Sequence, residues 1–259
     1  MTLPKGMLGW LICMPMLLFC TGCITETTGG FSSNPSPEEA LNRRVGLARQ
    51  YIGEGNWENA KRNLQLAADI DPNNAEVYEA FGLVYQSTGE FELAEMNFLR
   101  ALDVDPKLSR ARNNYAAFLS SVGRYEEAEK EFERVTTDTL YRARPLAFVN
   151  LGLTRLRLGD NAGAEQAFAR SLSMDRRNTI ALLEMGYLRL LDGAPDQAEL
   201  YYGVYRTIVS RQSPRGLLLG IGIAAASDDA DALSSYELAL RNLYPDSPEY
   251  RNYRAQQSQ

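Results

Sequence analysis

Glycine recurs at an interval of 34 residues along most of this chain. In three successive copies it opens the same pattern of glycine, a polar residue, an aromatic residue, an acidic residue, any residue and alanine. These copies are Gly55–Ala60, Gly89–Ala94 and Gly123–Ala128. A fixed period of this length is typical of an array of helix–turn–helix repeats. Because such an array grows by stacking and not by enclosing one compact core, the pattern predicts a single elongated all-α body.

The register of the repeat continues toward the C-terminus with one break. Gly159 and Gly193 are again 34 residues apart, and Ser227 follows after another 34. The interval from Gly123 to Gly159 is 36, so two residues are inserted, and we place them within residues 137–144. We expect this segment to form a longer helix or turn and to shift the stacking there. The register predicts six repeats and then a capping helix with a frayed tail, at residues 41–74, 75–108, 109–144, 145–178, 179–212, 213–246 and 247–259.

Small residues occupy the eighth and twentieth positions of the repeats, as Ala48 and Ala60 do in the first. They allow the two helices of a pair to approach closely, and a large side chain at position 24, such as Phe98 in the second repeat, fills the space beside them. Glycine at position 15 suits the turn because a left-handed backbone is favourable chiefly for glycine. One such pair cannot bury its own apolar face, so neighbouring pairs must stack.

Together with prolines that end the first two repeats, Pro72 and Pro106, these positions resemble the signature of the tetratricopeptide repeat family. The resemblance implies a right-handed superhelical array of six repeats, in which the first helix of each pair lines the concave face. In that family the second, fifth, ninth and twelfth positions of a repeat face this groove. The candidate partner-binding residues are therefore Val45, Arg49, Ile52, Leu83, Leu146, Val149, Leu153, Leu156, Ile180, Leu183, Tyr187 and Leu190.

The inner positions differ between the two halves of the predicted array. In repeats 1 to 3 they are mixed and mostly polar, and Arg49 and Arg110 are the only basic residues among them. In repeats 4 and 5 every inner position is apolar or aromatic. An apolar groove is unfavourable in water, so a partner or the protein itself must cover it. Two interpretations stay open: an amphipathic or extended apolar peptide lies in the groove, or a tighter local twist buries these side chains within the stack.

The first 22 residues have the character of a targeting segment. Lys5 is the only charge before the apolar run Met7–Phe19, which is shorter than the about 20 residues that a membrane span needs and fits a secretory signal peptide. The run ends in Cys20-Thr21-Gly22-Cys23, which resembles a bacterial lipobox although Leu is usual at position 20. The resemblance implies cleavage after residue 22, a lipid on Cys23, a flexible tether at 23–37 and, because Asp is absent at position 24, the outer membrane. An uncleaved anchor and a plain signal peptide are the alternatives.

The composition argues against an enzyme, a metal site and a nucleic-acid partner. The chain has no histidine, and its three cysteines, at positions 13, 20 and 23, all lie in the leader. The usual general base, thiol nucleophile and transition-metal ligands are therefore missing from the body. Removal of residues 1–22 deletes one base and no acid, which changes the balance from 27 against 33 to 26 against 33, a net charge of −7. Such an acidic body argues against nucleic acid as the main partner, and no cofactor is expected.

A leader with a lipobox, a tether and six repeats together resemble the PilF/PilW family of type IV pilus biogenesis lipoproteins, over the whole chain. The resemblance implies a pilotin, a protein held at the outer membrane by its lipid with its body in the periplasm. It implies binding of secretin subunits and promotion of their multimerisation or their placement in the outer membrane, on which pilus extrusion and twitching motility depend. Two alternatives remain: a lipoprotein adaptor for another envelope machine, such as outer-membrane protein assembly or cell-wall synthesis, and, more remotely, a periplasmic hydrolase.

Overall fold

The computed structural model of the chain describes residues 36–257. The predicted signal peptide, Cys23 and nearly all of the predicted tether lie outside the described residues. Residues 36–259 form one compact unit. Within the described part of this unit all regular structure is helical, and none of its helices combines the length and the apolar character needed to cross a membrane.

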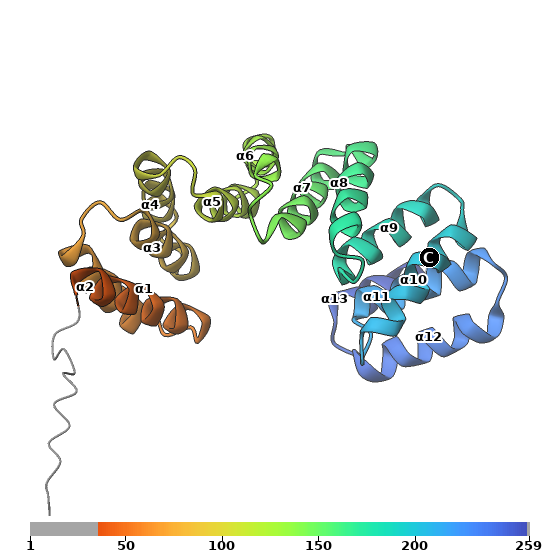
Figure 1. Ribbon diagram of the computed structural model, residues 1–259. Coiled ribbons are helices and arrows are strands. Elements are labelled where there is room, and N and C mark those ends of the chain that lie inside the picture. The colour runs from red at the N-terminus through yellow and green to blue at the C-terminus, as the bar shows by residue number, and fades with distance from the viewer. Residues whose placement is uncertain (1–35, 258–259) are drawn as a thin grey trace, which may run out of the picture. The chain divides into compact units, whose positions relative to one another are not determined.

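Six antiparallel helix pairs follow one another in chain order, and a thirteenth helix succeeds the last pair (Figure 1). Consecutive pairs pack against each other, as expected for a stack of tetratricopeptide repeats. The fold class predicted from the sequence is thereby confirmed. The helices are α1 (Pro37–Gly53), α2 (Trp57–Ile70), α3 (Ala75–Thr88), α4 (Phe91–Val104), α5 (Ser109–Ser121), α6 (Tyr125–Thr137), α7 (Arg144–Leu158), α8 (Asn161–Met174), α9 (Thr179–Leu191), α10 (Pro195–Ile208), α11 (Pro214–Ala226), α12 (Ala230–Leu243) and α13 (Pro248–Gln257).

Local sequence chemistry sets the ends of these helices. Ser36 and Glu39 form a reciprocal capping box at the start of α1, with the Ser36 amide donating to Glu39 Oε2 at 3.0 Å. The turns of the first five pairs each contain a glycine in the left-handed region, with φ between 70° and 82°. In the sixth pair Ser227 has an ordinary φ of −103°, and Asp228 takes the left-handed conformation with φ 56°. The sixth turn has no glycine, and its left-handed residue lies one position later than in the other five turns.

Close contact between a small residue and a ring holds the helices of a pair together. A Cβ atom added at Gly82 would lie 2.6 Å from a ring carbon of Phe98, and one added at Gly152 would lie 2.6 Å from a ring carbon of Phe168. Both rings are fully buried. Position 8 is thus small because position 24 of the same repeat needs the space.

The two-residue insertion changes how the middle of the stack is packed. The extra residues lie in the loop at 138–143, between α6 and α7. After this loop α7 packs extensively against α6 and α8, but it makes only sparse contact with α5 and α9, its neighbours on the inner face. The first helices of the earlier repeats, α1, α3 and α5, stay in closer contact with one another. The insertion therefore separates α7 from α5 and opens the inner face between them.

The last helix covers the apolar end of the stack. Tyr250 and Tyr253 of α13 pack on the buried cluster of Leu217, Ile221 and Leu240. No residue of α13 is itself buried, so this helix presents a polar outer surface. A terminal cap of this kind is what a repeat array requires, because its last repeat has no following neighbour.

We expect Gly152→Ala to destabilise the protein, because the new methyl group collides with the buried Phe168 ring. Overpacking of this kind costs about 1–3 kcal/mol. Gly46→Ala, also within a helix, is the matched control, since nothing lies within 4 Å of an added Cβ there. That change should raise stability by about 0.5–1 kcal/mol through helix propensity alone. Urea unfolding followed by circular dichroism measures both, and equal effects at the two positions would contradict this account of the packing.

Candidate partner-binding groove

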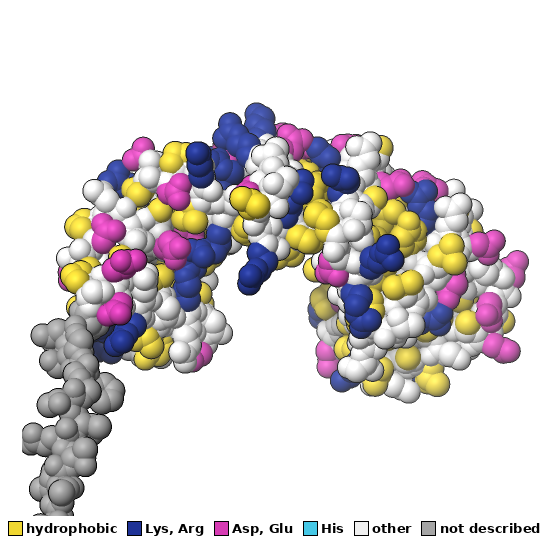
Figure 2. Space-filling model, in the orientation of Figure 1, with side chains coloured by type: hydrophobic (Ala, Val, Ile, Leu, Met, Phe, Trp, Pro, Cys, Tyr) yellow, Lys and Arg dark blue, Asp and Glu magenta, His cyan; other side chains and the backbone are white. Residues whose placement is uncertain are grey.

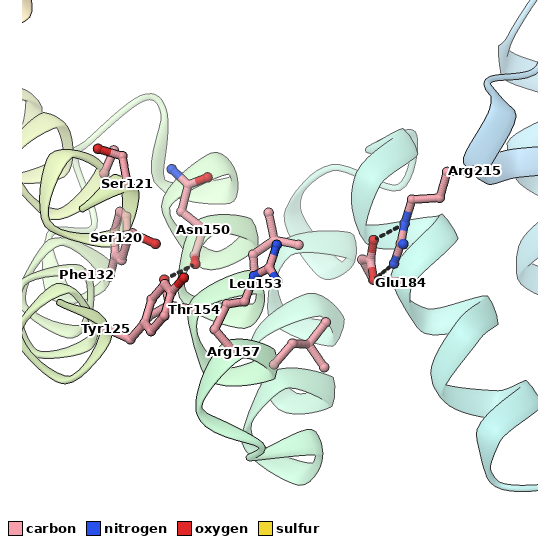
Figure 3. Close-up of a pocket in the computed structure, with 12 residues that line it drawn as sticks. Ser120, Ser121, Tyr125, Phe132, Asn150, Leu153, Thr154, Arg157, Glu184 and Arg215 are labelled. Atoms are coloured by element: carbon pink, nitrogen blue, oxygen red, sulfur yellow. Dashed lines mark hydrogen bonds and ion pairs between the residues drawn. The ribbon is translucent and has the colours of Figure 1, made fainter. Parts of the chain in front are cut away.

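The inner face of the array holds a concavity of about 820 Å³ centred on α7. Figure 3 shows that it runs from α5, across α7, to Glu184 of α9 and Arg215 of α11. Side chains of four first helices and one second helix thus meet at a single hollow. We call it the central groove, and its lining residues are Ala117, Ser120, Ser121, Tyr125, Phe132, Asn150, Leu153, Thr154, Leu156, Arg157, Glu184 and Arg215.

The position of α7 explains both the depth and the mixed character of the central groove. Because α7 stands apart from α5, the groove reaches Tyr125 and Phe132 of α6, which neighbouring first helices would otherwise cover. Leu153 and Leu156 supply apolar surface on α7, and both are half-buried. Hydrophobic side chains are visible among polar ones over α7, α8 and α9 (Figure 2). Such a surface suits an extended peptide that offers both apolar side chains and main-chain polar groups.

Hydroxyl and amide groups stand next to these leucines. Ser120 and Asn150 line the groove, and both are half-buried. Thr154 is buried, and its hydroxyl donates to the Asn150 carbonyl oxygen at 2.8 Å, so it is already satisfied within α7. The serine hydroxyl and the asparagine amide are therefore the groups best placed to hydrogen-bond the main chain of a bound peptide.

One wall of the central groove is a fixed ion pair. Arg215 donates to Glu184 from Nε at 3.0 Å and from Nη2 at 2.7 Å, as the dashed lines in Figure 3 mark. The guanidinium carbon of Arg215 also lies 4.4 Å from the ring centroid of Tyr187. Burial raises the pKa of Tyr187 to about 12, so its hydroxyl stays protonated and donates to the Arg215 carbonyl oxygen at 2.7 Å. The two opposite charges of this wall are therefore matched to each other.

Arg157 is the exception to this charge matching. It lines the central groove from the last turn of α7, its side chain is exposed, and it has no hydrogen-bond or ion-pair partner within residues 36–257. A cation without a partner beside apolar side chains favours a ligand that carries a carboxylate next to apolar residues. Arg157 therefore gives the groove a preference for an acidic ligand, which the neutralised ion pair on the other wall does not supply.

The first half of the inner face is closed by ion pairs. Glu79 of α3 is 0% exposed, and its Oε2 lies 2.5 Å from Arg49 Nη2 and 3.4 Å from Arg110 Nε. Asn114 Nδ2 donates to the other carboxylate oxygen at 2.5 Å. The two arginines thus neutralise a buried carboxylate that would be costly to leave unpaired. They link three successive repeats and leave Arg49, a predicted partner-binding residue, engaged within the protein.

Several of the predicted groove residues belong to the core instead. Val45 and Val149 are buried in separate apolar clusters, and Leu183 is only 8% exposed. Their side chains point into the stack because neighbouring helices cover the fifth position of these repeats. Ile52 and Leu83 are half-buried and pack on such clusters. Val45 and Val149 thus have almost no surface to offer a partner, which corrects the sequence-based assignment at these two positions. Ile52 and Leu83 keep part of their surface, and Leu183 lines a smaller cavity.

The remaining predicted residues are divided among different surfaces. Leu153 and Leu156 lie in the central groove. Leu146 and Ile180 are the most exposed, at 44% and 43%. Ile180 opens into a second, smaller cavity of about 470 Å³ that it shares with Tyr205, Val209, Arg211 and Tyr244. Tyr187 is covered by Arg215, and Leu190 lies close enough to Gly222 that an added Cβ would be 2.6 Å from its Cδ2. The apolar inner line predicted for repeats 4 and 5 is therefore not one continuous groove.

Sequence reasoning placed Ser120 on the inner face but missed four other polar residues of the central groove. Asn150, Arg157 and Glu184 occupy positions that the four-position rule does not include, and Arg215 lies in the degenerate sixth repeat. The one signal that could have found them is the two-residue insertion, because it marks where the first helices separate. Within residues 36–257 no group of three or more carboxylates is placed to hold a metal ion.

Comparisons with known proteins agree with this architecture. Sequence models of the tetratricopeptide repeat family match residues 75–108, 97–130 and 149–214. The type IV pilus assembly protein PilF of Pseudomonas aeruginosa is 35% identical over 237 residues, which are 91% of this chain and 94% of that protein.

Two solved structures extend the likeness to three dimensions. The structure of Pseudomonas aeruginosa PilF has a TM-score of 0.80 and 36% identity, and the match covers 86% of this chain and all of that one. The structure of PilW, a widely conserved type IV pilus biogenesis factor, has a TM-score of 0.74 and 27% identity, with 83% and 98% of the two chains covered. The chain therefore belongs to the PilF/PilW family of tetratricopeptide-repeat proteins of type IV pilus biogenesis.

Proposed function

We propose that this protein is a pilotin, a non-catalytic scaffold that binds secretin subunits and promotes their multimerisation or their localisation in the outer membrane. The observation that carries the proposal is the central groove, an open concavity with apolar, hydrogen-bonding and cationic groups in a member of a pilus biogenesis family. The groove offers a surface for a peptide, and its one carboxylate, Glu184, is engaged by Arg215.

The geometry suggests how a client segment is held. Apolar client side chains would lie against Leu153 and Leu156, while the Ser120 hydroxyl and the Asn150 amide hydrogen-bond the main chain. An acidic client group would pair with Arg157. The fixed Glu184–Arg215 pair at the far wall then limits the length of chain that fits. Contact at several points gives selectivity without any chemical step, because each group that stays unpaired in a wrong ligand weakens its binding.

Membrane attachment belongs to the same proposal. A diacylglyceryl group on Cys23 would hold the protein at the periplasmic side of the outer membrane, where secretin subunits arrive. The segment between Cys23 and the start of α1 would act as a tether that keeps the groove close to the membrane yet free to reorient. A high local concentration of the scaffold raises the chance that subunits meet, even when each contact is weak.

Arg157→Glu should weaken secretin binding about tenfold, which corresponds to ~1.4 kcal/mol. The change replaces the unpaired cation of the central groove with an anion and touches no buried group. Arg241→Glu, an equal charge reversal at an exposed arginine of α12 outside the groove, should bind as the wild type does. Co-purification of secretin subunits from solubilised membranes measures the effect. Equal losses in the two variants would assign it to net charge and not to the groove, and enrichment of another envelope complex without secretin would reject the pilotin proposal.

Cys23→Ala tests the lipid anchor. We expect the variant to fold, to lose incorporation of labelled fatty acid and to leave the outer-membrane fraction, because no other cysteine remains after cleavage at the predicted site. Assembled secretin multimers should fall with it even though the groove is intact. Persistence of the label on the variant would show that the cleavage site or the acylated residue is another one.

A further inference from the structure

The two loops that flank α7 and α8 carry a concentration of arginines. Loop 138–143 contains Arg142, and loop 175–178 contains Arg176 and Arg177. The equivalent loops of the first two repeats read Asp-Pro-Asn-Asn at 71–74 and Asp-Pro-Lys-Leu at 105–108. Arginine thus stands at 176 where the earlier repeats have proline. We call these two loops the arginine edge.

The three arginines of this edge are exposed and unpaired. Most arginines of the described residues hold a carboxylate or a carbonyl group, as Arg155 does with Glu129 and Glu133. Arg142, Arg176 and Arg177 have no side-chain partner within residues 36–257. Unpaired cations in adjacent loops repel one another. An anionic surface outside the protein would offset this repulsion, so such a surface is the favoured partner.

The acidic residues of these loops are occupied by the loops themselves. Asp138 accepts hydrogen bonds from the Ser109 hydroxyl and from the Leu140 amide, the latter at 2.9 Å. Asp175 Oδ1 accepts from the Arg177 amide at 3.0 Å. Each carboxylate thus shapes a turn from within, and the arginine side chains extend beyond it into solvent.

The loop that contains Arg142 also exposes an apolar side chain. Leu140 is 92% exposed, more than any other large hydrophobic residue that the structure describes, and it sits at the two-residue insertion. Met174, at the end of α8 and just before the second loop, is 41% exposed. An exposed leucine beside arginines on a loop is the composition of a shallow membrane contact, in which the apolar side chain enters the interface and the cations meet lipid phosphates.

The chain topology places this edge where the protein would approach a membrane. In a stack of antiparallel helix pairs, the first helix of every pair starts on the same edge. Ser36, which precedes α1, therefore lies on the edge that also carries loops 138–143 and 175–178. The 35 residues before Ser36, which include the proposed acyl site, join the body at this edge. The point where this segment joins the body, Ser36, and the arginine edge thus share one side of the stack.

The opposite edge of the stack is acidic. It is formed by the turns within the helix pairs, and five of the six turns contain an acidic residue, at Glu54, Glu90, Asp160, Asp192 and the pair Asp228 and Asp229. The loops between the pairs hold five aspartates and five cations, so the charge of that edge is balanced. An anionic membrane would therefore repel the acidic edge more strongly than the edge that carries the arginines.

We propose that the arginine edge, with Leu140 at its tip, docks the body onto an anionic phospholipid surface. Leu140 inserts among the lipids while Arg142, Arg176 and Arg177 pair with their phosphates. The proposal rests on the membrane attachment proposed above and adds an orientation to it. The stack then stands with its acidic edge away from the membrane.

Flotation with vesicles tests the proposal on the full-length chain. Vesicles of phosphatidylcholine alone report binding through the N-terminal segment, and vesicles with added phosphatidylglycerol report the extra anionic contribution. We expect stronger binding to the anionic vesicles that falls when salt screens the charges. The triple variant R142Q/R176Q/R177Q should lose this extra binding, by about fivefold for each arginine near the surface. Leu140→Ser should weaken it a few-fold without loss of helicity, because the side chain is already in solvent.

The matched control removes the same charge elsewhere. K130Q/R157Q/R170Q changes three exposed cations of α6, α7 and α8 that are unpaired in the described residues and lie within the helices, outside both loops of the arginine edge. It should keep the wild-type preference for anionic vesicles. Equal losses in the two triple variants would overturn the proposal in favour of a net-charge effect. No preference for anionic over neutral vesicles would overturn it in favour of an acidic protein as the partner of this edge. The result is independent of secretin binding, which is scored separately, so failure of one proposal is distinguishable from failure of the other.

Discussion

Contact between a small residue and a buried ring is the interaction on which the stack depends. Gly82 on Phe98 and Gly152 on Phe168 leave no room for a single methyl group. Because the paired helices approach so closely, each pair is a thin plate with an apolar face on either side. Such a plate is stable only against its neighbours. Which residues are exposed on the inner face therefore depends on how successive helix pairs pack against one another, and not only on the residue type at each position.

The two-residue insertion changes the packing of successive helix pairs and so creates the surface proposed to be functional. In the first three repeats, where the interval is 34 residues, the first helices stay in contact and ion pairs such as Arg49–Glu79 close the inner face. Where the interval is 36, α7 packs more closely on α6 and separates from α5, and the central groove opens between them. The same insertion exposes Leu140 at the edge of the stack. One small change in the chain thus produces both the surface proposed for the client and the surface proposed for the membrane.

The fold was predictable because its determinants are local and periodic, whereas the groove was not. Spacing alone predicted the all-helical repeat array, and the left-handed glycines predicted its turns. The same spacing predicted that Val149 and Leu153 both face the groove, although Val149 is buried and Leu153 lines the groove. That difference depends on the angle between successive pairs, which the period does not encode. Arg157 was missed for the same reason, because only the three-dimensional structure shows that its charge is unpaired and lies in the groove.

The central claim is that the groove around α7 receives a secretin segment. The most direct measurement is site-specific photo-crosslinking in living cells, with the reactive residue at Ser120 in the groove. The same residue at Arg43, exposed on α1, gives the background. The account predicts an adduct from position 120 in which mass spectrometry finds a secretin peptide with apolar and acidic residues, and no such adduct from position 43. Adducts from position 120 that contain only components of another envelope machine would contradict it.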